Sequence, residues 1–336
     1  MANYKGIKGV KTQSLASDPT ASEAVGKLWY NTAGNALKYS AEGAGAWAAG
    51  GNLNRSQLHA NGSCGIQTAG LVASGETPGG VPVMLDVEEY DGTSWTEVNN
   101  VNTGRYGNGG AGRVAAGLTF GGFNLPSGSP VEKLTEAYDG TSWTEVADMI
   151  TARGYMASTN AAPSSACLCI GGNPATNKVE SWDGTSWTEE ATLTVNKNQG
   201  GGAGTTTAAL SFGGQTPGPT LATTETWNGT SWTEVNDLNT ARKSGGAAGA
   251  TNTAALFYGG KTAPGSNNVG VVEKWDGTSW TEVADLGTSK YLASSIGTSS
   301  LALAGGGRTA PPANVSYVGT EEWSDPVYSI KTVTVS

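Results

Sequence analysis

The sequence predicts an all-β fold made of repeated four-stranded units. The nonapeptide Tyr-Asp-Gly-Thr-Ser-Trp-Thr-Glu-Val occupies residues 90–98 and again residues 138–146. Near-copies continue the array, and periods of about 40 to 50 residues are typical of propeller blades or helical solenoids. The units lack helix-length apolar runs and are rich in Gly, Thr, Ser and Asn, so strands are expected. The Trp of each copy recurs at intervals of 48, 44, 45 and 48 residues, as Trp95, Trp143, Trp187, Trp232 and Trp280.

The unit that begins at Arg242 illustrates the four expected strands. A first strand follows Arg242, and residues 253–258 form an apolar second strand that is buried on both faces. Residues 271–275 alternate apolar and polar side chains, as a half-buried third strand does. Asp276-Gly277 then suits a tight hairpin because this pair tolerates positive φ, and residues 279–283 form the fourth strand.

A Gly pair ends the second strand, an aromatic residue ends the third, and a Trp opens the fourth. This pattern resembles kelch repeats. The resemblance implies a kelch-type β-propeller of six four-stranded blades, with seven as the alternative. The Gly pairs are Gly121-Gly122, Gly171-Gly172, Gly213-Gly214, Gly259-Gly260 and Gly305-Gly306, with Ser74-Gly75 as a degenerate first member. The basic residues before the first strands are Arg55, Arg105, Arg153, Lys197, Arg242 and Lys290.

Two segments compete to close the ring. Residues 327–335 are strongly β-forming and follow Trp323, which takes the place of a third-strand aromatic residue. At the other end, residues 37–39 and Trp47 resemble a decayed third and fourth strand, and they could supply most of a seventh blade. We expect an N-terminal arm and β-hairpin in residues 1–50 and the propeller in residues 51–336.

Charge and composition exclude several classes of function. The formal net charge of -9 argues against nucleic-acid binding through phosphate neutralisation. No segment has the length of a membrane span, and the N-terminus lacks the apolar core of a signal peptide, so synthesis in a cytoplasm is expected. Glutamates at one position of the outer strand predict a solvated acidic rim that keeps edge strands from pairing. These are Glu97, Glu145, Glu189, Glu234 and Glu282.

The residues that usually carry catalysis are scarce, and we predict a protein that is not an enzyme and has no cofactor or metal. The single histidine, His59, is interpreted as a polar residue of a first strand. Cys64, Cys167 and Cys169 are interpreted as small core residues, because a thiolate metal site would need more ligands. One carboxylate per hairpin turn, as at Asp91, is too few for calcium.

The connections between second and third strands differ most from one unit to the next. Variable loops on a uniform scaffold are a usual place for binding specificity, although inert connections are the alternative. We predict a ligand or partner site formed by Phe123, Asn124, Lys261 and Arg308, since an aromatic ring, an amide and two cations suit sugar or protein contacts. The connections span residues 77–83, 124–130, 173–177, 215–220, 261–268 and 308–314.

The first fifty residues differ from the rest of the chain. Residues 5–19 form an extended basic arm of a kind that docks onto a partner. The segment Gly-Lys-Leu-Trp-Tyr-Asn-Thr at 26–32 precedes a short hairpin. It resembles a module near the start of many tailed-phage virion proteins, including tail fibres, and the nearly identical repeats resemble in style structural proteins of marine phages. The expected anchoring residues are Tyr4, Lys5, Lys8, Lys11, Trp29 and Tyr30.

These resemblances imply a bacteriophage virion protein, made in the host cytoplasm and located in the virion. The arm would bind other virion proteins, and the propeller would attach to a host-surface glycan or protein as a tail fibre or tail-tip component. A homo-oligomer is compatible with this arrangement, whereas nucleic acid and membrane insertion are not expected. A capsid decoration protein is the alternative. A glycan-degrading enzyme would need a carboxylate pair in the central funnel, and the repeated glutamates lie on the outer strand instead.

Overall fold

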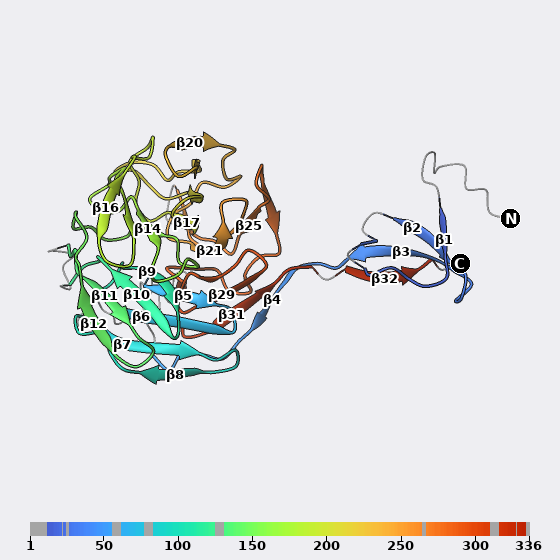
Figure 1. Cartoon of the computed structure of the whole chain (residues 1–336), viewed down its shortest axis with the longest axis horizontal. Helices are drawn as coiled ribbons and strands as arrows, with labels where there is room; N and C mark the ends of the chain where they lie inside the picture. Colours follow the sequence, from blue (N-terminus) through green and yellow to red (C-terminus); the bar gives the residue numbers. More distant parts are fainter. Residues whose placement is uncertain are drawn as a thin grey trace. The chain divides into compact units, whose positions relative to one another are not determined.

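The computed structural model describes residues 12–21, 23–24, 27–55, 62–76, 83–124, 131–263, 267–309, 316–326 and 328–333. Within these ranges the regular structure is β-strand throughout, which confirms the all-β prediction. No helix in the described part of the chain could span a membrane. The chain divides into two units (Figure 1). Unit 1 comprises residues 1–46 and 325–336, and unit 2 comprises residues 47–324.

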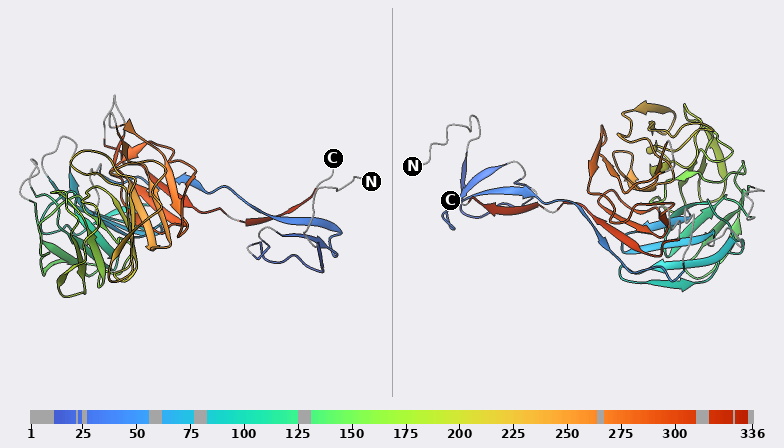
Figure 2. Two further views of the ribbon diagram at one scale, coloured as in Figure 1. Left: turned by 90° about the horizontal axis from the view of Figure 1, so that it is seen from above. Right: turned by 180° about the vertical axis from the view of Figure 1, so that it is seen from behind.

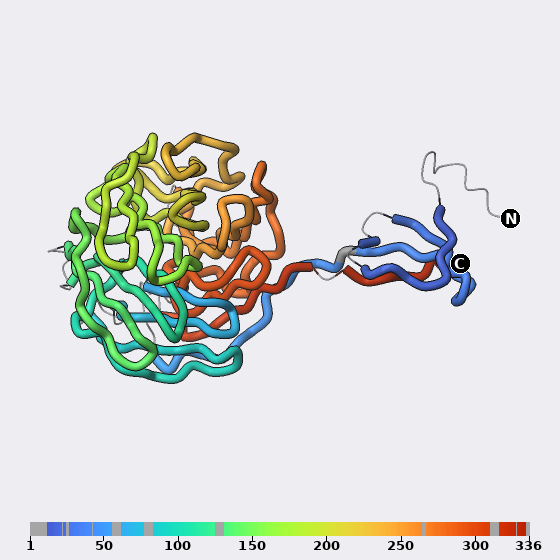
Figure 3. The backbone as a smooth tube through the Cα atoms, viewed as in Figure 1, coloured from blue at the N-terminus to red at the C-terminus, as the bar shows by residue number. Residues whose placement is uncertain are grey.

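Unit 2 has a propeller-like arrangement of antiparallel sheets. Its described residues form six four-stranded sheets, here numbered 1 to 6. In sequence order the sheets follow one another round a common centre (Figures 2 and 3). The first strand of each lies toward the centre and the fourth at the periphery, as β5, β9 and β17 and then β8, β12 and β20 illustrate (Figure 1).

The strand bounds follow the repeat. Sheet 1 contains β5 (Ser63–Ile66), β6 (Ala69–Glu76), β7 (Val83–Tyr90) and β8 (Trp95–Val98). Sheet 2 contains β9 (Gly109–Arg113), β10 (Ala116–Phe120), β11 (Thr135–Tyr138) and β12 (Trp143–Val146). Sheet 3 contains β13 (Ala157–Ser158), β14 (Cys167–Ile170), β15 (Val179–Trp182) and β16 (Trp187–Glu190).

The remaining sheets repeat the same order, except that sheet 6 takes its outer strand from the N-terminal side. Sheet 4 contains β17 (Gly201–Gly204), β18 (Ala209–Phe212), β19 (Thr224–Trp227) and β20 (Trp232–Val235). Sheet 5 contains β21 (Gly246–Thr251), β22 (Ala254–Tyr258), β25 (Val272–Trp275) and β26 (Trp280–Val283). Sheet 6 contains β28 (Ile296–Gly297), β29 (Leu301–Gly305), β31 (Thr320–Ser324) and β4 (Ala46–Ala49).

Strand β4, which contains Trp47, therefore completes the last sheet beside β31 (Figure 1). The C-terminal strand β32 (Tyr328–Thr332) pairs instead with β3 (Ala36–Glu42) in unit 1. The Gly pair of sheet 6 lies one residue later than expected. Gly306 and Gly307 have φ of 65° and 98°, matching 61° and 102° at Gly121 and Gly122.

The Trp that opens each fourth strand fills the space between neighbouring sheets. In sheet 5, Trp280 is 5% exposed and donates its indole N–H to Thr224 Oγ1 of sheet 4 at 3.0 Å. Trp187 and Trp95 make the same 3.0 Å bond to Thr135 and Thr320 of their preceding sheets. Each of these Trp residues therefore stabilises the contact between sheets in two ways, by burying apolar area and by forming a directional hydrogen bond.

Three members of this series lack a Thr partner: Trp143 donates to a backbone carbonyl oxygen instead, and the other two have no partner among the described residues. Trp232 packs in one core cluster with Val179, which stands where sheets 2, 4 and 6 have Thr. Trp47 packs in another with Val272. The indole nitrogens of both Trp residues are buried and have no hydrogen-bond partner in the described structure. A missing hydroxyl on the facing strand accounts for both cases.

The cysteines are core residues. Cys64, Cys167 and Cys169 are buried and free, and Cys167 and Cys169 pack with Phe120 and Trp187 between sheets 2 and 3. Burial raises the pKa of the Cys64 thiol to about 12. Among the described residues, no three His, Cys, Asp or Glu side chains come together as a metal site.

Unit 1 is a four-stranded sheet in the order β1, β2, β3, β32. Strand β1 (Gln13–Leu15) runs parallel to β2 (Leu28–Asn31), and the other neighbours are antiparallel. Asp18 accepts hydrogen bonds from Trp29 Nε1 at 3.0 Å, Asn31 Nδ2 at 2.6 Å and Lys38 Nζ at 2.7 Å. These bonds, led by the one from Lys38, lower the pKa of Asp18 to about 2.

Two short strand pairs complete the described secondary structure. Strand β23 (Lys261–Thr262) pairs with β24 (Asn267–Asn268) after sheet 5's second strand. Strand β27 (Lys290–Tyr291) pairs with β30 (Arg308–Thr309) beside sheet 6. Both pairs lie at the end of unit 2 where first strands begin and second strands end. We call this end the loop face.

Candidate functional site

Five of the repeated basic residues form buried ion pairs, which shows that they are structural and are not candidate binding residues. Arg153, which precedes the first strand of sheet 3, lies 2.9 Å from Glu180 of its third strand, and both side chains are 1% exposed. Lys197 and Glu225 repeat the pair at 3.2 Å in sheet 4. The other members are Arg105 with Glu136, Arg242 with Glu273, and Lys290 with Glu321.

These glutamates also hold the turn that leads into each sheet. Glu273 accepts hydrogen bonds from the backbone N–H groups of Asn239 at 2.7 Å and Thr240 at 3.3 Å. The five cations are therefore paired with carboxylates inside the fold and are not available to a ligand. Arg55 differs from this series, because its side chain is 51% exposed and approaches Asp86 at 3.6 Å and Glu97 at 3.5 Å.

A chain of backbone hydrogen bonds runs round the centre of unit 2 at the loop face. Tyr155 N–H donates to Gly107 O at 2.6 Å, and Gln199 N–H donates to Tyr155 O at 2.8 Å. Ser244 and Leu292 continue the chain with bonds of 2.7 Å each. All five residues have φ between 52° and 64°. Four of them are not glycine, so the surrounding sheets hold the backbone in a sparsely populated conformation.

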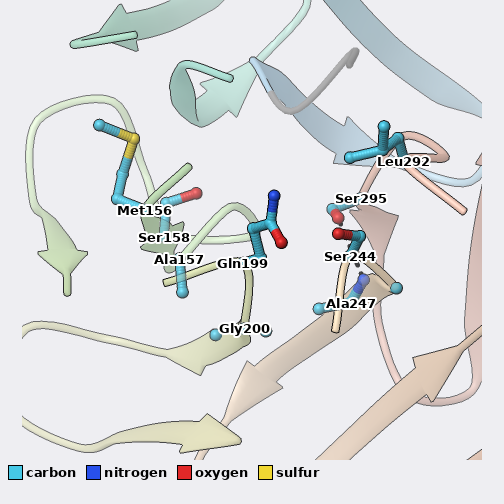
Figure 4. Close-up of a pocket in the computed structure, with 12 residues that line it drawn as sticks. Met156, Ala157, Ser158, Gln199, Gly200, Ser244, Ala247, Leu292 and Ser295 are labelled. Atoms are coloured by element: carbon cyan, nitrogen blue, oxygen red, sulfur yellow. Dashed lines mark hydrogen bonds between the residues drawn. The ribbon is translucent and has the colours of Figure 1, made fainter. Parts of the chain in front are cut away.

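The pocket inside this ring is small and polar (Figure 4). Ser158, Gln199, Ser244 and Ser295 are among the residues that line it. Its volume of about 30 Å³ leaves room for a few water molecules, not for a sugar ring. Asn160, from the connection between β13 and β14, crosses the centre and donates to Ala247 O at 3.0 Å and to Ser295 O. No carboxylate is among the lining residues.

Lys261 and Arg308, two of the predicted site residues, come together around Tyr291. The ammonium group of Lys261 lies 3.7 Å from the centre of the Tyr291 ring. Arg308 is the strand partner of Tyr291. Lys243 forms a backbone bridge with Lys261 and donates to Gln215 Oε1. We call Lys243, Lys261, Tyr291 and Arg308 the cation cluster.

Phe123 and Asn124, the other two predicted residues, lie in the connection that follows β10. Phe123 is 2% exposed and packs between Tyr106 and Tyr155, with ring centroids 5.2 and 5.0 Å away. Its ring is therefore not exposed to a ligand. Asn124 Nδ2 lies 3.4 Å from Glu132 Oε1.

Tyr155 belongs to this aromatic group, with its ring centroid 6.1 Å from that of Tyr106 and 5.0 Å from that of Phe123. Burial raises the pKa of Tyr155, and the charges of Tyr106 and Glu76 add to this effect while Arg308 opposes it. Tyr155 is half-buried, and so are Lys243, Lys261 and Arg308. The half-buried side chains at the loop face therefore combine one phenol with three cations.

Sequence reasoning missed Lys243, Tyr291, Tyr106 and Tyr155. Lys243 and Tyr291 each follow directly on a buried cation of the repeat, at a position where Tyr106 and Asn198 also stand. Tyr155 is one residue further along its unit. These residues could have been found from the sequence by one signal. They occupy positions that vary among nearly identical units and lie next to the basic position that hardly varies.

The expected anchoring residues have different environments in unit 1. Tyr4, Lys5, Lys8 and Lys11 lie outside the described residues, as does His59 in unit 2. Trp29 is 1% exposed and bonded to Asp18, so its place is inside the unit. Tyr30 is 37% exposed.

Strand register places Leu28, Tyr30, Leu37 and Tyr39 on the face of the unit 1 sheet opposite Trp29. Tyr39 is 40% exposed, and the two Leu side chains are half-buried. We call these four residues the open face of unit 1. Such a row of apolar and aromatic side chains is typical of a surface that binds a partner.

Comparison with protein families and with curated proteins identified no relative of this chain. No protein-family model matches the chain, and none of the curated proteins matches it. The function must therefore be argued from the geometry of the two units.

Proposed function

We propose that the chain is a non-enzymatic structural protein of a tailed-bacteriophage virion. In this proposal unit 1 binds other virion proteins, and unit 2, a kelch-type propeller, attaches the particle to the host surface as a tail fibre or tail-tip component. The proposal rests on one observation, the contrast between the two units in charge and exposed side chains. The resemblance of residues 26–32 to a module of phage virion proteins points in the same direction.

Unit 1 has the features of an anchor. It contains six Lys residues against four Asp or Glu, a formal charge of +2, whereas unit 2 contains 13 Lys or Arg against 24 Asp or Glu, a formal charge of -11. Its open face presents Tyr30 and Tyr39 to a partner, and aromatic residues are enriched in protein interfaces. A basic surface with exposed aromatic rings suits docking onto an acidic protein surface.

Unit 2 has the features of a binding module. Buried ion pairs and Trp residues hold its sheets together, while the residues that differ between repeats collect at the loop face. The cation cluster and Tyr155 lie there, and the six variable connections contain no Asp or Glu. Specific sites placed on a uniform scaffold are the usual design of attachment proteins.

Electron microscopy of labelled particles tests this proposal. An epitope tag inserted in the exposed hairpin turn at residues 228–231 would mark unit 2 without touching either proposed surface. We expect label at the tail tip or fibres. Label spread over the head would instead support a capsid decoration protein, and its absence from purified particles would overturn the virion assignment.

Two variants extend the test to the anchor. A chain lacking residues 1–24 retains β4 and should keep unit 2 folded, but it should not join the particle. The Tyr30→Ser, Tyr39→Ser double variant alters only exposed side chains and should reduce incorporation in the same direction. Normal incorporation of both variants would exclude unit 1 as the anchor.

A further inference from the structure

The cation cluster places one positive group over an aromatic ring and two more on the paired backbone segments beside it. Lys261 Nζ lies 3.7 Å from the centre of the Tyr291 ring, and Arg308 is paired with Tyr291 through β27 and β30. Lys243 lies beside Lys261 through a backbone bridge. Burial and the charge of Lys261 together lower the pKa of Lys243, so the two ammonium groups repel one another.

The cluster differs from the other buried cations of unit 2 because it lacks carboxylate partners. In the described part of the chain, no carboxylate forms an ion pair with Lys243, Lys261 or Arg308. Arg308 Nε is a buried donor without a hydrogen-bond acceptor among these residues, as are Arg153 Nε and Arg242 Nε, so the missing ion pair is what distinguishes Arg308. Glu76 opposes the charge of Arg308, because burial raises the pKa of Glu76 and the charge of Arg308 lowers it. One carboxylate leaves three cations largely uncompensated.

The undescribed loop residues cannot supply the missing charge. Residues 56–61, 77–82, 125–130, 264–266 and 310–315 contain no Asp or Glu. Unit 2 nevertheless carries a formal charge of -11. Its acidic residues are concentrated in third and fourth strands and in hairpin turns, away from the variable connections. A positive site in an acidic unit is a specific feature, since the general charge would repel anions.

We propose that the cation cluster binds the anionic group of a surface saccharide, a carboxylate or a phosphate. Arg308 offers a planar donor set that suits either oxyanion, and Lys243 and Lys261 add point charges. Tyr155, which is half-buried, supplies an aromatic edge for contact with the sugar ring, whereas Tyr291, at 7% exposed, supports Lys261 from below. The inference rests on the attachment role proposed above and gives it a ligand class.

Calorimetric titration of the purified full-length chain provides the test. The probes are tetragalacturonate for the carboxylate, mannose 6-phosphate for the phosphate, and maltotetraose as the uncharged control. We expect binding of at least one charged probe, weakened by added salt, and no binding of maltotetraose. Preference for one charged probe identifies which anion the site takes.

Single variants locate the site. Lys261→Gln and Arg308→Gln should each weaken binding of the charged probe by about tenfold or more, because each removes a charge-assisted contact. Lys133→Gln removes the same charge from an exposed residue that pairs with Asp148 at 3.4 Å, and it should change affinity by less than about twofold. Lys243→Gln is measured alongside these variants. The thermal unfolding temperature of every variant is also measured, so that a loss of binding can be distinguished from a loss of folding.

Three results would overturn the inference: no binding of either charged probe, equal binding of maltotetraose, or equal effects of Lys133→Gln and the cluster variants. Because the assay uses the isolated protein, its failure leaves the virion location intact. Conversely, binding of a charged probe by a protein absent from particles would reject only the virion assignment.

Discussion

Arg242 and Lys243 are neighbours in the chain, yet their environments are opposite. Arg242 is fully buried and forms an ion pair with Glu273, whereas Lys243 is half-buried at the loop face beside another cation. The first position is basic in sheets 2 to 6, and the second is Tyr, Gly, Asn, Lys and Tyr in the same sheets. In this molecule the residue that repeats holds the fold, and the residue that varies lies at the loop face, where we propose that a ligand binds.

The largest expected effect on stability comes from removing the carboxylate of a repeated ion pair. Glu273→Gln leaves the guanidinium of Arg242 buried without a counter-charge, and we expect a loss of about 3–5 kcal/mol in the free energy of unfolding. Chemical denaturation measures it. Lys243→Met is the matched control next in sequence, and it should change the same quantity by less than about 0.5 kcal/mol. Equal losses in the two variants would show that burial and pairing do not distinguish these cations.

A second variant removes a smaller element of the repeat. Thr224→Val deletes the hydroxyl that accepts the indole N–H of Trp280 and leaves that donor buried between sheets 4 and 5. We expect a loss of about 1–3 kcal/mol in the free energy of unfolding. The same substitution at exposed Thr96 serves as control, since no packed neighbour depends on it. A loss no greater than that of Thr96→Val would contradict the assigned role.

The reverse change, from Val to Thr, can be made in a sheet that lacks the Thr hydroxyl. Val179 faces Trp232, whose indole nitrogen is buried without a partner. Val179→Thr should restore the bond found at Thr224 and raise the free energy of unfolding by up to about 1 kcal/mol. Val179→Ala, which shortens the side chain without adding an acceptor, should lower it. Destabilisation by both would mean that the backbone spacing between sheets 3 and 4 does not admit the bond.

The sequence period predicted the fold well because each unit repeats the same short-range pattern. Hairpin turns such as the one at Asp91 and the Gly pairs followed from local backbone requirements, with an error of one residue at Gly306-Gly307. Long-range pairing was harder. The partnership of Lys38 with Thr332 joins two ends of the chain, and no local pattern indicates it.

The candidate site was only partly predictable for the same reason. Lys261 and Arg308 were identified because they open variable loops, but their convergence on Tyr291 depends on strand pairing. Phe123 was chosen as an aromatic ring suited to sugar or protein contacts, and it is buried against Tyr106 and Tyr155. Sequence variability located the face, whereas exposure and neighbours required the structure.

Unit 1 extends the comparison to an ion pair that is neither repeated nor fully buried. Asp18 and Lys38 are 24% and 21% exposed, and the pKa of Asp18 is lowered from 3.8 to about 2. A carboxyl group with a lowered pKa stabilises the folded unit at all pH values above its ordinary value, and this contribution disappears as the pH falls through the folded-state pKa. The window of loss therefore lies between pH 3.8 and about 2.

Hydrogen exchange in residues 27–42 tests this window directly. At neutral pH, Asp18→Asn should exchange faster there than the unaltered chain, because Lys38 loses its charged acceptor. Below the window the two chains should exchange alike, since the carboxyl group is then protonated. Glu23→Gln is the control: its carboxylate is exposed and accepts hydrogen bonds from Thr20, so it should matter less. If the difference in exchange rate persists unchanged at low pH, the effect is due to side-chain shape. The Asp18–Lys38 pair would then contribute no electrostatic stability to the proposed anchor.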